Sequence, residues 1–388
     1  MRSSFAIAAR FLCAFAIFVV ILQTGLARER GPRVEVVCPT PPSPVRLAEK
    51  QVLVYELHVT NFDMVPLTLK RLEIFEDTDK TQPPRIFSDD ALATIMVKAG
   101  SMGGAKDSQT IPPSQRAVIF LWIEVGADKP VPANLRHRMV FVAGAPGEAT
   151  GSTPTEATLE DFSVPISHDA VPVLTSPFDG GVWLAGDLAN DSNHRRSLAA
   201  VDGHVHAPER FAIDWIKVGS NGDSHHDGTA RNENWWGYGE PIHAVADGEV
   251  TEVVDGIPEN TPRVLPTQVT LDNIAGNHVI VRIAPNRYAT FAHLQNGSIK
   301  VRLHDHVRRG DVLGLLGNTG NATGAHLHFQ VTDGNSVLQS EGVPFVFDKF
   351  TDLGPGSDYE LDKHLSIPRE RSMPGNNAVV EFASPKKK

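Results

Sequence analysis

The sequence predicts a mainly β protein with two domains. Few stretches of its 388 residues keep the apolar period of a helix, whereas many short runs alternate apolar and polar residues as strands do. The chain is long enough for two domains, each with its own core. Its composition is ordinary for a soluble globular protein and its net charge is −10, so we expect neither nucleic acid nor an anionic membrane surface as a partner.

The N-terminal segment, residues 1–27, has the layout of a secretory signal peptide. A weakly charged start leads into an apolar run at residues 11–22, and Gly25-Leu26-Ala27 offers small residues for cleavage. The apolar run is shorter than the roughly 20 residues of a spanning helix, which favours a cleaved signal over an uncleaved membrane anchor. We therefore expect an exported protein, periplasmic or extracellular, without a membrane anchor after cleavage.

Residues 34–167 are expected to form an immunoglobulin-like β-sandwich. Leu53, Tyr55 and Leu57 alternate with the residues between them, and residues 117–125 are apolar on both faces, as in a central strand. Turn-forming residues separate the short strands, as in such a sandwich. Because no catalytic constellation is evident here, we expect a spacer, a lid or a surface for a partner.

The segments on either side of the second domain have little regular pattern. Residues 168–200 are rich in Pro and Gly and are expected to be a linker, with the His-Arg-Arg triplet at 194–196 in a solvated loop or facing an anionic group of a substrate. The second domain is expected at residues 201–350. Residues 351–388 turn polar and Pro-rich and end in three lysines, which predicts a poorly ordered tail.

Three histidines of the second domain are expected to lie close together. His326 and His328 are two residues apart in an expected strand, so both imidazoles would point to one face. Residues 288–294 alternate like a second strand and carry His293, and turn residues join the two segments. A single histidine in a strand is more often structural, but three together with an aspartate upstream fit zinc chemistry. Spacing alone leaves both interpretations open.

These segments resemble the lysostaphin/LytM-type zinc metalloendopeptidases, which cut peptide cross-bridges in bacterial cell walls. The resemblance covers about residues 203–335 and also includes the run at 239–250. It implies a LytM-type β-roll of antiparallel strands, the duplicated hybrid motif fold, with one bound Zn²⁺ ion. Its most specific segments are Phe291-Ala292-His293-Leu294, Gly310-Asp311, Gly317-Asn318-Thr319-Gly320 and Gly324-Ala325-His326-Leu327-His328-Phe329.

The resemblance assigns Asp214 and His328 as zinc ligands. Under it, zinc would lower the pKa of a bound water to about 7, and His293 and His326 would orient that water and stabilise the oxyanion as catalytic residues. It places Arg210 where the family has its remaining ligand, a histidine four residues before the aspartate. Arginine has only donors and stays protonated, so it cannot ligate a cation.

Other groups could complete or replace this site. A substitute ligand would require the chain to fold back on itself, and the candidates for it are His206, His225 and His226. Alternatively, Arg210 neutralises Asp214 in a metal-free site or binds a carboxylate of the substrate. A nearby group of aromatic residues would either line a substrate groove or form a local core cluster. It consists of Trp235, Trp236 and Tyr238.

Two functions follow from the resemblance. The first is an exported zinc metalloendopeptidase that hydrolyses peptide bonds of peptidoglycan cross-bridges. The second is a catalytically degenerate module of the same fold that binds peptidoglycan or activates a partner hydrolase. Arg210 favours the second, whereas the retained aspartate and three histidines favour the first, because a site freed from catalysis has little reason to keep four such groups together. We favour the enzyme.

Overall fold

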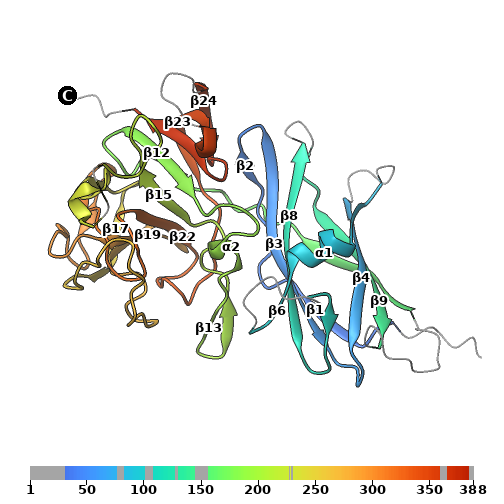
Figure 1. The fold of residues 1–388 in the computed structure, drawn as a ribbon. Helices are drawn as coiled ribbons and strands as arrows, with labels where there is room; N and C mark the ends of the chain where they lie inside the picture. Colours follow the sequence, from blue (N-terminus) through green and yellow to red (C-terminus); the bar gives the residue numbers. More distant parts are fainter. Residues whose placement is uncertain are drawn as a thin grey trace, which may run out of the picture.

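The computed structural model describes residues 31–76, 83–100, 108–126, 130–144, 156–226, 228, 230–358 and 365–383. The expected signal peptide, residues 1–27, lies outside the described residues. The described chain is mainly β, with a two-sheet N-terminal part beside a larger C-terminal sheet (Figure 1). Within these ranges, no helix combines the length and the apolar character needed to cross a membrane.

The N-terminal part is a sandwich of two five-stranded sheets around one apolar cluster. Its immunoglobulin-like character stays a prediction. A short helix, α1 (Asp89–Ile95), connects the two sheets. The first sheet contains β1 (Val34–Val37), β2 (Val45–Leu47), β3 (Lys50–Asn61), β6 (Met96–Lys98) and β8 (Arg116–Gly126). The second sheet contains β4 (Leu67–Glu76), β5 (Arg85–Ser88), β7 (Thr110–Ile111), β9 (Asn134–Ala143) and β10 (Glu156–Pro165).

Strand β3 belongs to the cores of both domains. Its side chains alternate between two faces, so Leu53 and Tyr55 enter the sandwich cluster while Val52 and Val54 join the core of the C-terminal domain. Glu56 lies on the same face as Val54 and is also buried, with 1% of its surface exposed. The two domains therefore pack directly against each other, with a carboxylate inside the contact.

The C-terminal domain is built on an eleven-stranded sheet, in which ten strands run in the order β11-β23-β25-β12-β15-β22-β19-β18-β17-β20 and β24 pairs with β23. Those strands are β11 (Val173–Leu174), β12 (Gly181–Gly186), β15 (Ile213–Lys217), β17 (Gly248–Val254), β18 (Asn277–Ala284), β19 (Arg287–Leu294), β20 (His306–Val307), β22 (Leu327–Thr332), β23 (Val346–Pro355), β24 (Ile367–Ser372) and β25 (Ala378–Phe382).

Smaller elements decorate this sheet. Two further sheets have two strands each: β13 (Ala199–Val201) with β14 (His204–His206), and β16 (Pro241–His243) with β21 (Val312–Leu315). The helical turns are α2 (Asn193–Arg196), η1 (Asn232–Asn234) and η2 (Gly356–Asp358).

The structure differs from two boundaries expected from the sequence. Residues 168–200, expected to be a linker, supply β11, β12 and α2. Residues 351–388, expected to be a poorly ordered tail, supply the end of β23 together with β24 and β25, and β25 lies between β12 and β23. The strands β11, β12, β24 and β25 are short, and β24 carries a proline and several charges. Their alternation of apolar and polar residues is therefore weak. Pairing with strands that are remote in the sequence stabilises them instead.

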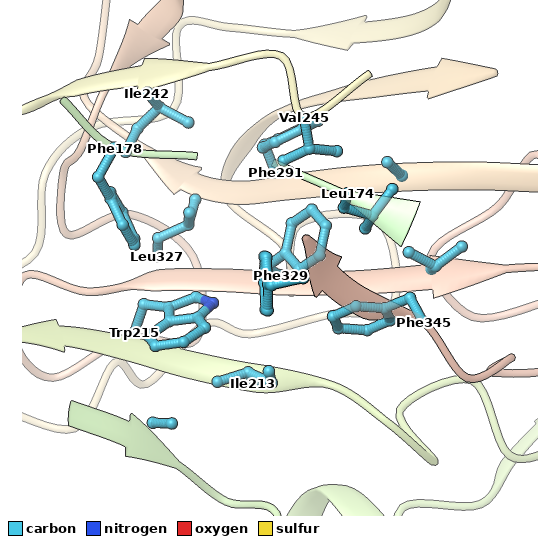
Figure 2. Packing of buried hydrophobic residues seen from close by; sticks show 14 of the residues in the cluster. Leu174, Phe178, Ile213, Trp215, Ile242, Val245, Phe291, Leu327, Phe329 and Phe345 are labelled. Carbon is cyan, nitrogen blue, oxygen red and sulfur yellow. The ribbon is translucent and has the colours of Figure 1, made fainter. Parts of the chain in front are cut away.

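The core of the C-terminal domain lies against one face of the large sheet. Ile213 and Trp215 of β15, with Leu327 and Phe329 of β22, point into it together with Phe291 of β19 (Figure 2). Because strand side chains alternate, the residues between them point to the opposite face. The sheet therefore separates an apolar face from a face that carries Asp214 and His328.

A substitution at Phe382 tests whether the C-terminal strand, β25, packs in this core. Its ring is 2% exposed and lies 5.5 Å, between ring centroids, from both Trp215 and Phe347. We expect Phe382→Ala to lower the free energy of unfolding by about 3–5 kcal/mol in denaturant titrations, the usual cost of truncating a buried Phe. The exposed neighbour Glu381 provides the control, and Glu381→Ala should change stability by less than about 0.5 kcal/mol. Equal, small effects would mean that β25 does not pack as described.

Candidate metal centre

The strand register brings the expected site residues together. Asp214 of β15 lies directly opposite His328 of β22, and Ala292 of β19 lies opposite His328 from the other side. His293 follows Ala292 at the end of β19, where its φ of 62° departs from strand geometry, and its side chain borders the same cavity as His328. His326 immediately precedes β22 on the same face as His328. Three central neighbouring strands thus place one carboxylate and three imidazoles on the polar face of the sheet.

A fourth histidine, His194, completes this group. Its Nε2 lies 3.5 Å from Oδ2 of Asp214, the same distance as Nε2 of His326. Nδ1 of His328 lies 3.1 Å from the other carboxylate oxygen, Oδ1. The ring of His194 stands edge-on to that of His328, with the centroids 4.8 Å apart. The carboxylate is therefore surrounded by imidazole nitrogens.

His194 is presented by the short helix α2. Ser192 caps this helix, because its hydroxyl accepts a hydrogen bond of 3.1 Å from the backbone N–H of Arg195. The sequence-based expectation of a solvated loop at 194–196 is wrong for Arg195, which is 1% exposed. The spacing of His194 and Asp214 in the sequence does not predict that they lie close together, because a strand pair and a loop separate them. The sequence draws attention to the triplet at 194–196, but it gives no signal that His194 lies beside Asp214.

Hydrogen bonds fix the orientation of the other three histidines. His293 and His326 each have Nδ1 beside a backbone carbonyl, at 2.8 Å from Thr319 and 2.9 Å from Gly324. A carbonyl can only accept, so Nδ1–H donates and Nε2 faces the site. His328 is turned the other way, with Nε2 2.9 Å from Oε1 of Gln330 and Nδ1 toward Asp214.

The charge states follow from this arrangement. Burial acts to raise the pKa of Asp214, but the charges of His326 and His194 and the hydrogen bond from His328 outweigh it and hold the pKa well below its usual range. Burial acts to lower the pKa of His328, but the hydrogen bond and attraction to Asp214 raise it to about 9. Burial, with the nearby His326 and His328, holds the pKa of His293 well below its usual value. The carboxylate thus attracts positive charge, whether a proton on an imidazole or a metal ion.

The donor set fits a zinc ion. One ligand atom from each of His194, Asp214 and His328 lies within 4.8 Å of the others. Nδ1 of His194 is buried and has no hydrogen-bond partner among the described residues. Two imidazoles and one carboxylate that leave a fourth position open form a usual ligand set of catalytic zinc sites. His293, His326 and His328 also border a cavity of about 380 Å³ in which a substrate group can approach these donors.

Arg210 lies in a buried ion-pair network. Its guanidinium donates to both oxygens of Glu56 at 2.8 to 3.1 Å, to the carbonyl of Gly342 at 2.7 Å and to Oε2 of Glu341 at 2.6 Å. The partners of Asp214 are the histidines. The expected contact of Arg210 with Asp214 or with a substrate carboxylate is therefore replaced by contacts within the protein, and its 5% exposure leaves little room for a ligand.

The three candidate substitute ligands lie apart from the Asp214 cavity, whose lining includes none of them. Nδ1 of His206 lies 3.2 Å from Oε1 of Glu341. His225 stacks on Trp235, and its Nε2 lies 3.1 Å from a guanidinium nitrogen of Arg263. The ring of His226 is 4.7 Å from that of Trp236.

The aromatic group divides between the two roles expected for it. Trp235 and Tyr238 are partly buried and pack against the C-terminal core, which favours the local core cluster. The hydroxyl of Tyr238 accepts a hydrogen bond of 3.1 Å from the side-chain amide of Gln295. Trp236 is 42% exposed, so among the three it is the ring most open to a substrate.

Three solved structures are similar to this chain. The catalytic domain of the antimicrobial peptidase lysostaphin from Staphylococcus simulans is 18% identical, over 37% of this chain and 78% of that one, with a TM-score of 0.22. A putative peptidase M23 from Pseudomonas aeruginosa is 18% identical over 73% and 92%, with a TM-score of 0.25. A zinc-containing peptidase from Vibrio cholerae is 15% identical over 72% and 77%, with a TM-score of 0.24.

A family model gives the more specific match. Residues 235–339 match the model of Peptidase family M23, and this range includes His293, His326 and His328. Asp214 and His194 lie before it, on β15 and α2. The match confirms the resemblance drawn from the sequence, and the chain therefore carries a peptidase family M23 domain.

Proposed function

We propose that this chain is an exported zinc metalloendopeptidase that hydrolyses peptide bonds of cell-wall peptidoglycan. The observation that carries the proposal is the cluster of His194, Asp214 and His328 beside two further histidines of fixed orientation. The match to Peptidase family M23 supports the reaction class, and peptidoglycan peptides are the substrates that this family suggests. The signal-like N-terminal segment supports export, which a cell-wall substrate requires.

His194, Asp214 and His328 would hold the zinc ion. Zinc bound there would supply Lewis-acid chemistry, because it lowers the pKa of a coordinated water from 15.7 to about 7 and polarises a substrate carbonyl. The hydrogen bond from Nε2–H of His328 to Gln330 leaves Nδ1 as the ligand atom and fixes the plane of the ring. His194 would take the place of the histidine that the resemblance expects at position 210.

The remaining two histidines, His293 and His326, would act on the attacking water. Each donates Nδ1–H to a backbone carbonyl, so the neutral ring presents the lone pair of Nε2 to the cavity. His326 would take a proton from the attacking water and return it to the leaving amine, since its Nε2 faces the cavity 3.5 Å from Oδ2 of Asp214. His293 stays neutral because burial lowers its pKa, and its Nε2 would orient the water by accepting a hydrogen bond.

The metal ligands can be tested by zinc content. We expect the wild-type protein, purified without chelator and offered zinc, to hold close to one ion per chain by elemental analysis. His328→Ala and His194→Ala should each weaken zinc binding by at least about 10–100-fold, since each loses a direct ligand and loss of a supporting partner alone costs that much.

A histidine outside the site provides the control for this experiment. His204 is exposed in β14, and His204→Ala should bind zinc as the wild type does. A wild-type protein that holds no zinc would contradict the metallopeptidase and favour the degenerate module that binds peptidoglycan or activates a partner hydrolase. Zinc lost with His328→Ala but kept with His194→Ala would remove His194 from the ligand set.

The catalytic histidine can be separated from the ligands by one further variant. We expect His326→Ala to keep nearly full zinc content while the rate of peptidoglycan digestion falls by about 100-fold or more, the scale of a lost acid–base group. The measurement combines elemental analysis with release of soluble peptides from purified cell walls. Zinc and activity that fall together would assign His326 to the metal, whereas unchanged activity would remove it from catalysis.

A further inference from the structure

The N-terminal sandwich contributes a carboxylate to the immediate surroundings of the metal centre. Glu56 of β3 is 1% exposed and accepts hydrogen bonds from Arg195 and Arg210, two residues of the C-terminal domain. Burial acts to raise the pKa of Glu56, but the two guanidinium groups outweigh it and lower the pKa to about 2. Glu56 is therefore an anion at the contact between the domains.

Both arginines stand next to residues of the candidate metal centre. Arg195 follows His194 within α2, and Arg210 lies four residues before Asp214. One buried carboxylate thus binds an arginine from each of the two chain segments that carry His194 and Asp214. In Figure 1, α2 lies between β3 of the sandwich and the strands β15 and β22.

The position of α2 depends on the sandwich through several further contacts. A guanidinium nitrogen of Arg195 donates to the backbone carbonyls of Tyr55 at 2.9 Å and Leu121 at 3.4 Å. The side-chain amide of Asn190, just before the helix, donates to the carbonyl of Phe120 at 3.1 Å, and the guanidinium of Arg195 lies 5.1 Å from the centroid of the Phe120 ring. A helix of four residues has little stability of its own, so these contacts determine where His194 lies.

Burying Arg195 at this contact lowers the stability that the contact can contribute to the fold. Burying a guanidinium removes it from water, and Nε of Arg195 has no hydrogen-bond partner among the described residues. Buried ion pairs are often no more stabilising than apolar residues of similar volume. A buried, incompletely satisfied arginine next to a metal-ligand candidate is better explained by the orientation that it gives to that ligand.

We infer that Arg195 is a positioning residue for the metal centre and that, bound to Glu56 and its neighbours on the sandwich, it holds α2 so that His194 faces Asp214 and His328. This inference rests on the proposed zinc site. It gives the N-terminal sandwich a defined role, because without the docking surface on β3 and β8 the third ligand has no fixed place. The sandwich is then part of the site rather than a spacer.

The test is a double-mutant cycle on zinc affinity in the full-length protein. Arg195→Met keeps the packing volume and leaves the pair of Glu56 with Arg210 in place. We expect it to weaken zinc binding by about 10–100-fold in titrations against a competing chelator, the range for a lost supporting contact. In a His194→Ala background, the same change should have no further effect on zinc affinity, because it acts through His194.

Two further variants separate positioning from general destabilisation. Arg138→Met breaks another ion pair of the sandwich, with Glu73 at 3.2 Å, and should leave zinc affinity unchanged. Arg195→Lys keeps a cation near Glu56 but loses the fork that also reaches Tyr55, so its loss of affinity should be smaller than that of Arg195→Met. If Arg195→Met does not fold, Arg195→Lys replaces it in the cycle.

The outcomes distinguish this inference from the proposed function. A wild type that binds no zinc would overturn both. Zinc binding that is weakened by His194→Ala but unchanged by Arg195→Met would leave the proposed function in place and overturn the positioning role of Arg195. An equal effect of Arg195→Met with and without His194 would also overturn it, because the change would then act on the other ligands.

Discussion

The buried contact of Glu56 with Arg195 and Arg210 determines how the two domains meet. A buried carboxylate is tolerated only when it is paired and hydrogen-bonded, and removing one partner of such a pair typically costs about 3–5 kcal/mol. Glu341 adds a second carboxylate to Arg210, so two acidic and two basic side chains share the contact. Each group needs the others, which limits the relative positions available to the two domains.

Strand alternation places the apolar core on one face of the large sheet and the candidate site on the other. In β22, Leu327 and Phe329 enter the apolar core while His328 faces the cavity, and Asp214 in β15 alternates with Ile213 and Trp215 in the same way. The antiparallel register of β15 and β22 then makes Asp214 and His328 direct neighbours. A shift of one residue in this register would turn Asp214 and His328 into the apolar core and the aromatic side chains toward the cavity.

The sequence was sufficient for the features that depend on local pattern. The His-x-His spacing predicts a shared strand face, and the flanking glycine and asparagine turns predict the approach of His293. Pairing partners across the chain carry no such local signal. His194 depends on the docking of a four-residue helix against another domain, Glu56 appears as one polar residue in an alternating strand, and β25 lies in the middle of the sheet although the segment before it looks like a tail.

Arg210 illustrates the same limit. The resemblance places it where the family has a ligand histidine, and arginine cannot bind a cation. Its partners are contributed by residues 56 and 341, which no spacing rule connects to it. In the structure Arg210 and Arg195, the residue after His194, both bind the carboxylate of Glu56. We propose that the site takes His194 from α2 in place of the histidine that the resemblance expects four residues before Asp214.

The most direct test of this arrangement is a crystal structure of the zinc-loaded, full-length protein. We expect one ion with a nitrogen of His194 and Nδ1 of His328 at about 2.0–2.1 Å and an oxygen of Asp214 at about 2.0–2.2 Å, with the fourth position open to solvent. A zinc ion bound by Asp214 and His328 with His194 turned away, or an ion held by another histidine in its place, would contradict it.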